Sequence, residues 1–132
     1  MKKLISFCIF FFVVFSVNAQ SQAETLEWLR AKQPSIRDMS SNLIARGNGK
    51  LTIDETSIKL STEGSSTNIQ WDKVKDITLN YSNITIVSED LTDGNGTFIR
   101  LNTDVNISSK FIKALKHMAT LKNAKMVKDE LF

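Results

Sequence analysis

IQWDKVKDITLNYSNITI, residues 69–86, is the stretch that decides the fold. Its apolar side chains recur at every second position, in three short runs: Ile69 and Trp71, then Ile77, Leu79 and Tyr81, then Ile84 and Ile86. Such alternation indicates strands with one buried and one solvated face. The Ser82-Asn83 step between the last two runs predicts a tight turn joining antiparallel neighbours.

The same alternation continues on both sides of this stretch. It marks strands around Leu51–Ile53, Ile58–Leu60 and Ile99–Leu101, and Leu43–Arg46 would add one more ahead of the first turn. Clusters of glycine, asparagine and serine predict the intervening turns. The sequence therefore predicts a strongly curved antiparallel meander of six or seven strands.

Two helices flank the strands. A helix over residues 22–33 is predicted to start at a Ser21 cap and to stop at Pro34. A second helix begins at Asn106 or Ser108 and carries one apolar stripe: Ile107, Phe111, Ala114, Leu115, Met118 and Leu121. The predicted class is α+β, a barrel-like sheet with an N-terminal helix and a C-terminal amphipathic helix that packs on it.

The start of the chain has the three parts of a signal peptide. Lys2 and Lys3 give a positive end, Leu4–Val17 an apolar run, and Val17-Asn18-Ala19 the short residues that precede a cleavage point. The run is shorter than the roughly 20 residues that a membrane-spanning helix needs. We expect export to a bacterial periplasm or secretion; the alternative is an uncleaved membrane anchor.

Cleavage would leave residues 20–34 as the N-terminal helix and residues 35–132 as a single β domain with its closing helix. Loss of residues 1–19 removes the only cysteine, so no disulfide is expected. It also removes two lysines while all 14 acidic residues remain, and the formal net charge falls from +3 towards neutrality. Global charge therefore gives no support to a nucleic-acid partner.

The order of these elements resembles the pleckstrin-homology-like and GRAM-like domains. The resemblance covers Leu43–Lys122 and rests on the strand meander, the Trp71–Ile77 segment (WDKVKDI) leading into a strand, and the single closing helix. It implies a curved barrel plugged by the C-terminal helix. It also implies binding of lipid head groups, phosphorylated residues or peptides rather than catalysis. Lipid-binding members cluster basic residues in the first strand-to-strand loop, whereas Arg46–Lys50 has only two.

The chemistry-bearing residues favour a protein that is not an enzyme. His117 is the only histidine and lies on a lysine-flanked helix face, so neither a catalytic triad nor a zinc site is predicted. The acidic loop Glu89–Gly96 is interpreted as a polar hairpin turn, because an EF-hand would need glutamate where Leu101 stands. An enzymatic alternative would need its carboxylates inside a concave pocket. No catalytic residue, metal ligand or cofactor is assigned.

We therefore predict a non-catalytic binding or scaffold module of the cell envelope, whose partner is another envelope protein or a peptide. The alternative is a binder of anionic lipid or lipopolysaccharide head groups. Its candidate contacts are basic residues of the first loop and the last helix: Arg46, Lys50, Lys110, Lys113 and Lys116. The same lysines would also suit the solvated side of an amphipathic helix.

Trp28 is the candidate partner anchor, because it lies off the main apolar stripe of the first helix. In one interpretation the helix shields a sheet edge and Trp28 is its removable anchor. In the other the helix is permanently packed and Trp28 contacts the segment Ile36–Met39.

Overall fold

The computed structural model describes residues 22–47, 49–89 and 96–126. The predicted signal peptide, the Ser21 cap and most of the acidic loop Glu89–Gly96 lie outside the described residues. Within the described ranges, no helix has the length and apolar character that crossing a membrane requires.

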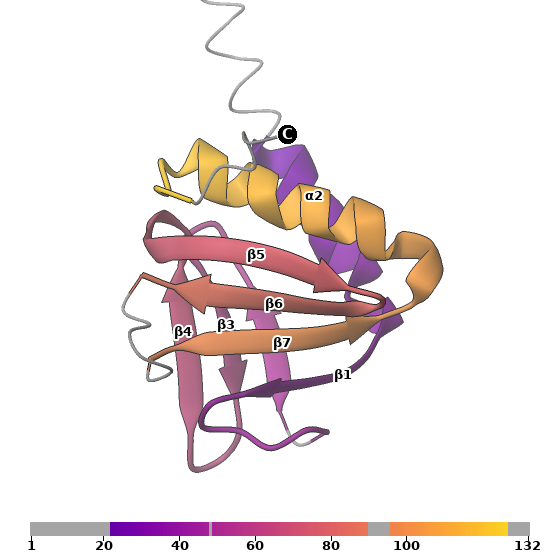
Figure 1. Cartoon of the computed structure of the whole chain (residues 1–132), viewed down its shortest axis with the longest axis vertical. Helices are drawn as coiled ribbons and strands as arrows, with labels where there is room; N and C mark the ends of the chain where they lie inside the picture. The colour runs from indigo at the N-terminus through magenta and orange to yellow at the C-terminus, as the bar shows by residue number, and fades with distance from the viewer. Residues whose placement is uncertain (1–21, 48, 90–95, 127–132) are drawn as a thin grey trace, which may run out of the picture.

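Within the described residues, seven antiparallel strands form two sheets, which confirms the predicted α+β class (Figure 1). A four-stranded sheet has the order β1-β7-β6-β5 and a three-stranded sheet the order β2-β3-β4. In Figure 1 the strands of the two sheets cross, one sheet lying behind the other. The strands are β1 (Ile36–Ser41), β2 (Lys50–Ile53), β3 (Ser57–Ser61), β4 (Ser66–Gln70), β5 (Val74–Asn80), β6 (Asn83–Ser88) and β7 (Phe98–Thr103).

The apolar side chains that alternate in the sequence fill the space between the two sheets. In β6 Ile84 and Ile86 are buried, and in β7 Ile99 and Leu101 are buried, while the intervening positions face outward. Trp71 is also fully buried, although it lies in a short 3₁₀ turn, η2 (Trp71–Lys73), rather than in a strand. Its indole N–H donates to the Asp54 carbonyl at 2.8 Å, which satisfies its one polar atom inside the core.

The first strand is not where the sequence placed it. It is β1, and the predicted Leu43–Arg46 segment is the turn that follows. The Ser41 hydroxyl accepts from the backbone N–H groups of Leu43 and Ile44, at 3.2 and 3.1 Å, so the side chain replaces the strand pairing. Ile44 still reaches the core, with 3% of its surface exposed.

Tyr81 was predicted to be the last inward-facing residue of its strand, and this is wrong. Its φ of 58° puts it in the left-handed region, in the turn between β5 and β6, and its side chain is 88% exposed. A tight antiparallel turn requires such a conformation, and turn geometry here outweighs the aromatic ring's preference for burial.

The N-terminal helix (residues 22–32) runs into a 3₁₀ turn, η1 (Gln33–Ser35), which contains Pro34. Its Leu29 is fully buried. One side chain from the helix and one from η1 reach the edge strand β2: Arg30 Nε donates to the Ile53 carbonyl at 2.8 Å, and Gln33 Nε2 donates to the Leu51 carbonyl at 2.6 Å.

Helix α2 (Val105–Leu121) packs on β5, η2 and β6, along one end of the two sheets (Figure 1). Phe111, Leu115 and Met118 are buried, as its apolar stripe predicts. The helix starts earlier than expected. Its cap is Asp104, whose carboxylate accepts from the Asn106 N–H at 3.0 Å, so neither Asn106 nor Ser108 is the cap.

Candidate functional site

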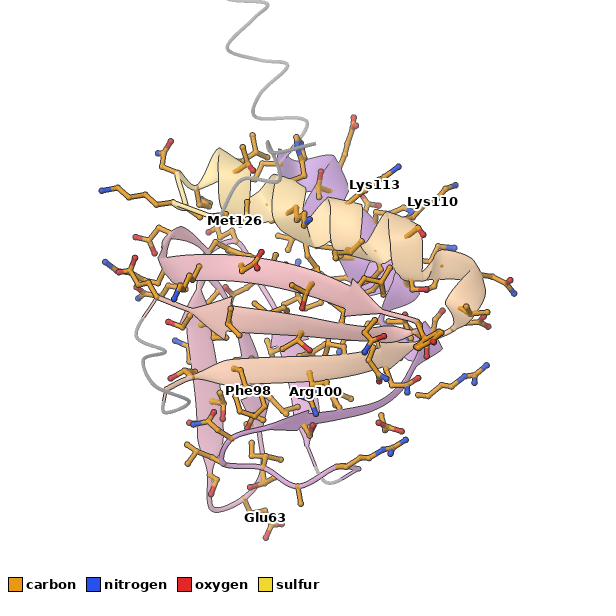
Figure 2. All side chains as sticks on the ribbon, viewed as in Figure 1. Glu63, Phe98, Arg100, Lys110, Lys113 and Met126 are labelled. Atoms are coloured by element: carbon orange, nitrogen blue, oxygen red, sulfur yellow. The ribbon has the colours of Figure 1, made fainter. Side chains whose placement is uncertain are left out.

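Strand β7 has one face in the core and one polar face. Ile99, Leu101 and Thr103 are buried, so the residues between them project from the outer side of the four-stranded sheet. Arg100 and Asn102 are therefore the outward residues at the centre of this sheet, whose neighbouring strands are β1 and β6. Figure 2 shows Arg100 and its neighbour Phe98 on this side of the sheet.

The outer face contains a depression of about 380 Å³. It is lined by polar and charged side chains from all four strands and from the loop after β1: Asp38, Ser40, Arg46, Asn80, Asn83, Thr85 and Arg100. The strand register explains this gathering. Arg100 lies opposite Ser40 of β1 on one side and opposite Thr85 of β6 on the other. Side chains directly opposite in antiparallel strands are close enough to act on one ligand.

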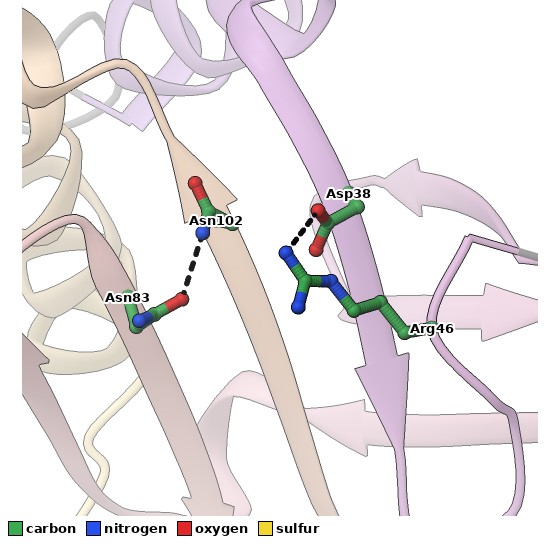
Figure 3. Close-up of polar contacts among 4 residues, drawn as sticks. All are labelled: Asp38, Arg46, Asn83 and Asn102. Atoms are coloured by element: carbon green, nitrogen blue, oxygen red, sulfur yellow. Dashed lines mark hydrogen bonds and ion pairs between the residues drawn. The ribbon is translucent and has the colours of Figure 1, made fainter.

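Arg46 reaches back from its loop to the sheet (Figure 3). Its Nη2 atom lies 2.9 Å from an Asp38 carboxylate oxygen, with the arginine side chain 72% exposed and the aspartate 26%. The hydrogen bond to Asp38 and the charge of that carboxylate raise the pKa of Arg46 above its usual range. Arg46 is therefore cationic at every working pH. Because the arginine is so exposed, the pair contributes little to stability but fixes a guanidinium above the sheet.

A second contact orders the same face. The Asn102 Nδ2 amide donates to Asn83 Oδ1 at 3.0 Å, between neighbouring strands β7 and β6 (Figure 3). This bond orients the Asn83 carboxamide. Its oxygen is occupied, and no described residue accepts from its N–H groups.

Arg100 differs from Arg46 because no described residue forms an ion pair or hydrogen bond with its guanidinium. The group lies 5.7 Å from the centroid of the Phe98 ring, two residues away on the same face. Such stacking holds the cation in place by attraction to the ring and leaves its N–H donors available.

The five basic residues predicted from the sequence do not form one site. Lys110 and Lys113 are exposed on α2, and Lys116 is half-buried on the same helix. Arg46 belongs to the outer sheet face. Lys50 begins β2 and lines a separate pocket together with Gly49 and Gly64. Figure 2 shows Lys110 and Lys113 on the helix, apart from Arg100.

Trp28 is half-buried, and its ring packs against Phe111 of α2 with 6.0 Å between centroids. One of the two interpretations of the sequence placed Trp28 against Ile36–Met39, whereas its ring contact in the structure is with Phe111. A groove of about 440 Å³ runs beside the indole, lined by residues of both helices: Glu24, Thr25, Trp28, Lys113, Ala114 and His117. Within the described ranges, no group of histidine and acidic side chains has a metal-binding arrangement.

Sequence reasoning found Arg46 but missed Arg100, Asn83 and Asn102. The available signal was the pair of polar residues at successive outward positions of each strand, Asn83 and Thr85 in β6 and Arg100 and Asn102 in β7, which the register places opposite one another. Polar alternation is equally typical of a strand face that only meets water, so it could not single these residues out.

Comparison with known proteins supports the architecture. No protein-family model matches the chain, and no curated protein matches its sequence. Among solved structures, the inner membrane complex sub-compartment protein 3 of Toxoplasma gondii is similar, with a TM-score of 0.52 and 15% identity over 76% of this chain and 86% of that one. The complex of the FERM and C-terminal domains of Drosophila Merlin aligns with a TM-score of 0.47 and 15% identity, over 67% of this chain and 30% of that chain. The similarity to the first of these structures shows the fold alone, and that fold is consistent with the pleckstrin-homology-like architecture expected from the sequence.

Proposed function

We propose that this protein is a non-catalytic binding module of the cell envelope, and that it binds its partner on the outer face of the four-stranded sheet. One observation carries the proposal. Guanidinium, hydroxyl and amide groups from four strands and a loop converge on one open depression. These groups hold ligands by charge and hydrogen bonds.

The composition of the depression favours recognition over reaction. A serine nucleophile needs a base within hydrogen-bond reach. Ser40 lines the depression, but its lining includes neither histidine nor lysine, and the chain's one histidine lies on α2. Asp38 is the only acid of the lining, and it is held by Arg46.

The envelope location is proposed from the start of the sequence. Two lysines, the apolar run Leu4–Val17 and the step Val17-Asn18-Ala19 together support export with cleavage before Gln20. The intact mass of the protein recovered from the cell envelope tests this. A mass that still includes residues 1–19 would contradict cleavage.

The binding proposal is tested by affinity capture from a cell-envelope extract, with three immobilised chains starting at Gln20. These are the wild type, Arg100→Glu, and the control Lys59→Glu, which makes the same type of change on an exposed position of β3 in the other sheet. We expect a protein that the wild type and Lys59→Glu retain and that Arg100→Glu loses. Equal capture by all three chains would show that the outer face is not the binding surface.

A second candidate function is contact with an anionic membrane or lipopolysaccharide surface through α2. The observation in its favour is that α2 contains three lysines and no acidic residue, and that Lys110 and Lys113 are exposed. Each lysine near such a surface contributes about 1 kcal/mol. This function uses a different part of the molecule, so the two candidates can be tested separately.

A further inference from the structure

The depression on the outer sheet face carries a net positive charge. Two arginines and one aspartate line it, and its other lining residues are uncharged. Asp38 is already paired with Arg46, whereas Arg100 has no acidic partner in the described structure. The depression therefore has an unbalanced cation, held in place by the Phe98 ring.

The uncharged lining residues supply further donors around this cation. The hydroxyls of Ser40 and Thr85 lie on either side of Arg100 in the register. The Asn83 amide has its oxygen occupied by Asn102, which leaves its N–H groups as the part that can bind a ligand. A group that fits must be an anion with several acceptor oxygens.

We propose that the depression binds a phosphate group, held between Arg100 and Arg46; this rests on the proposed use of the outer face as the binding surface. A phosphate monoester carries a charge near −2 and has three terminal acceptor oxygens. Arginine pairs with such groups by two parallel hydrogen bonds. A carboxylate has only two oxygens and one charge, so it would leave more of these donors unpaired.

Asp38 sets the strength of this site. Its carboxylate positions Arg46 above the sheet, but it also repels an incoming anion and competes for the same guanidinium. A phosphate therefore binds against this competition, and removal of the Asp38 charge should tighten binding while loss of Arg100 should weaken it. General attraction to a basic protein would give the same two signs, so the built site is recognised by comparison with a variant that removes a positive charge elsewhere on the surface.

The test uses the chain from Gln20, which retains every described residue, with amide shifts followed by NMR during titration. The probes are glucose 6-phosphate and O-phosphoserine, with glucose and acetate as controls. We expect saturable shifts in residues 38–40, 83–85 and 100–102 with both phosphates. Arg100→Gln should weaken binding by about tenfold or more, and Asp38→Asn should strengthen it several-fold.

Lys59→Gln is the matched control, because it removes one exposed positive charge from β3 of the other sheet without touching the depression. Its affinity for glucose 6-phosphate should equal that of the wild type. Equal losses in Lys59→Gln and Arg100→Gln, equal binding of acetate, or no saturable shift on the sheet face would overturn the proposal. Arg100 is exposed, so Arg100→Gln should keep the wild-type spectrum away from the depression.

The phosphate could belong to a lipid head group or to a soluble molecule, and vesicles separate the two sources. Capture by vesicles of phosphatidate in phosphatidylcholine that is lost in Arg100→Gln identifies a lipid phosphate. Binding of glucose 6-phosphate without Arg100-dependent vesicle capture identifies a soluble source. If capture of a protein partner depends on Arg100 but no phosphate binds, the binding module stands and the phosphate proposal fails.

Discussion

The rings of Trp28 and Phe111 pack against each other, with 6.0 Å between their centroids and 53° between their planes. This contact joins the N-terminal helix to α2, two elements at opposite ends of the sequence. Phe111 is fully buried and Trp28 half-buried. The pair therefore connects the first helix to the core of the β domain, in the tilted geometry that aromatic rings prefer.

Phe111→Ala is expected to lower the free energy of unfolding by about 3–5 kcal/mol, since it removes a fully buried ring and leaves a cavity. Urea denaturation measures the change. The control is Phe98→Ala on the outer sheet face, where the ring is half-exposed. It should cost less than about half as much, because less apolar surface is returned to water. A loss below about 1 kcal/mol for Phe111→Ala would show that α2 is not part of the core.

Asp104→Ala should destabilise the protein by about 1 kcal/mol, because it removes the side chain that caps α2. The matched control is Asn106→Ala at an exposed position of the first turn, with an expected effect within about 0.5 kcal/mol. Urea midpoints of the two variants give the comparison. A larger loss of stability in Asn106→Ala than in Asp104→Ala would indicate that Asn106 caps the helix, as the sequence suggested.

Most strands could be predicted, because apolar residues alternate with polar ones wherever one face of a sheet is buried and the other faces solvent. β1 was missed for a physical reason: its register is interrupted between Ile36 and Asp38, so the alternation is broken. Tyr81 was misplaced because nothing local distinguishes an aromatic residue in a left-handed turn from one at the end of a strand.

The site was harder to predict than the fold. A search for clustered charges in the sequence selects lysines that are close in sequence, such as those of α2. It does not identify residues that lie far apart in sequence and are brought together by strand pairing. Arg100 and Arg46 are separated by five strands in the chain and meet at one depression because β1 pairs with β7. That pairing joins the two ends of the β domain, and no short-range pattern in the sequence reports it.

Gly49→Ala should be destabilising by about 1–3 kcal/mol, as overpacking in a filled core usually is. A Cβ atom added there would lie 2.5 Å from Leu60 Cδ1 and 3.3 Å from Ile44 Cγ2, so these side chains must shift. Gly64→Ala is the control, since nothing lies within 4 Å of its added Cβ. Thermal or urea unfolding of the two variants should separate them clearly. Equal stabilities would mean that Leu60 moves aside without cost.

The lysine face of α2 predicts a salt-sensitive attraction to anionic vesicles. Replacing Lys110 and Lys113 together with glutamine should lower the partition onto phosphatidylglycerol vesicles by more than about tenfold, since each lysine contributes about 1 kcal/mol near such a surface. Flotation at two ionic strengths measures this. The control is Lys59→Gln with Lys75→Gln, two exposed lysines on strands. A similar loss in both double variants would indicate attraction by net charge alone.

The last prediction concerns whether the N-terminal helix can leave the edge of β2. An exposed edge strand can accept an added peptide strand, and here Arg30 and Gln33 occupy the outward carbonyls of that edge. Leu29, however, is fully buried, and release of the helix would empty its place in the core. We therefore expect the amides of residues 26–30 to exchange as slowly as those of β3, and Leu29→Ala to cost about 2–5 kcal/mol. Glu27→Ala, at an exposed position of the same helix, should be near neutral.

Hydrogen exchange followed by NMR gives the decisive comparison. If the helix amides exchange far faster than the sheet, local opening is cheaper than global unfolding. The helix is then a removable cover over an edge that can bind a strand.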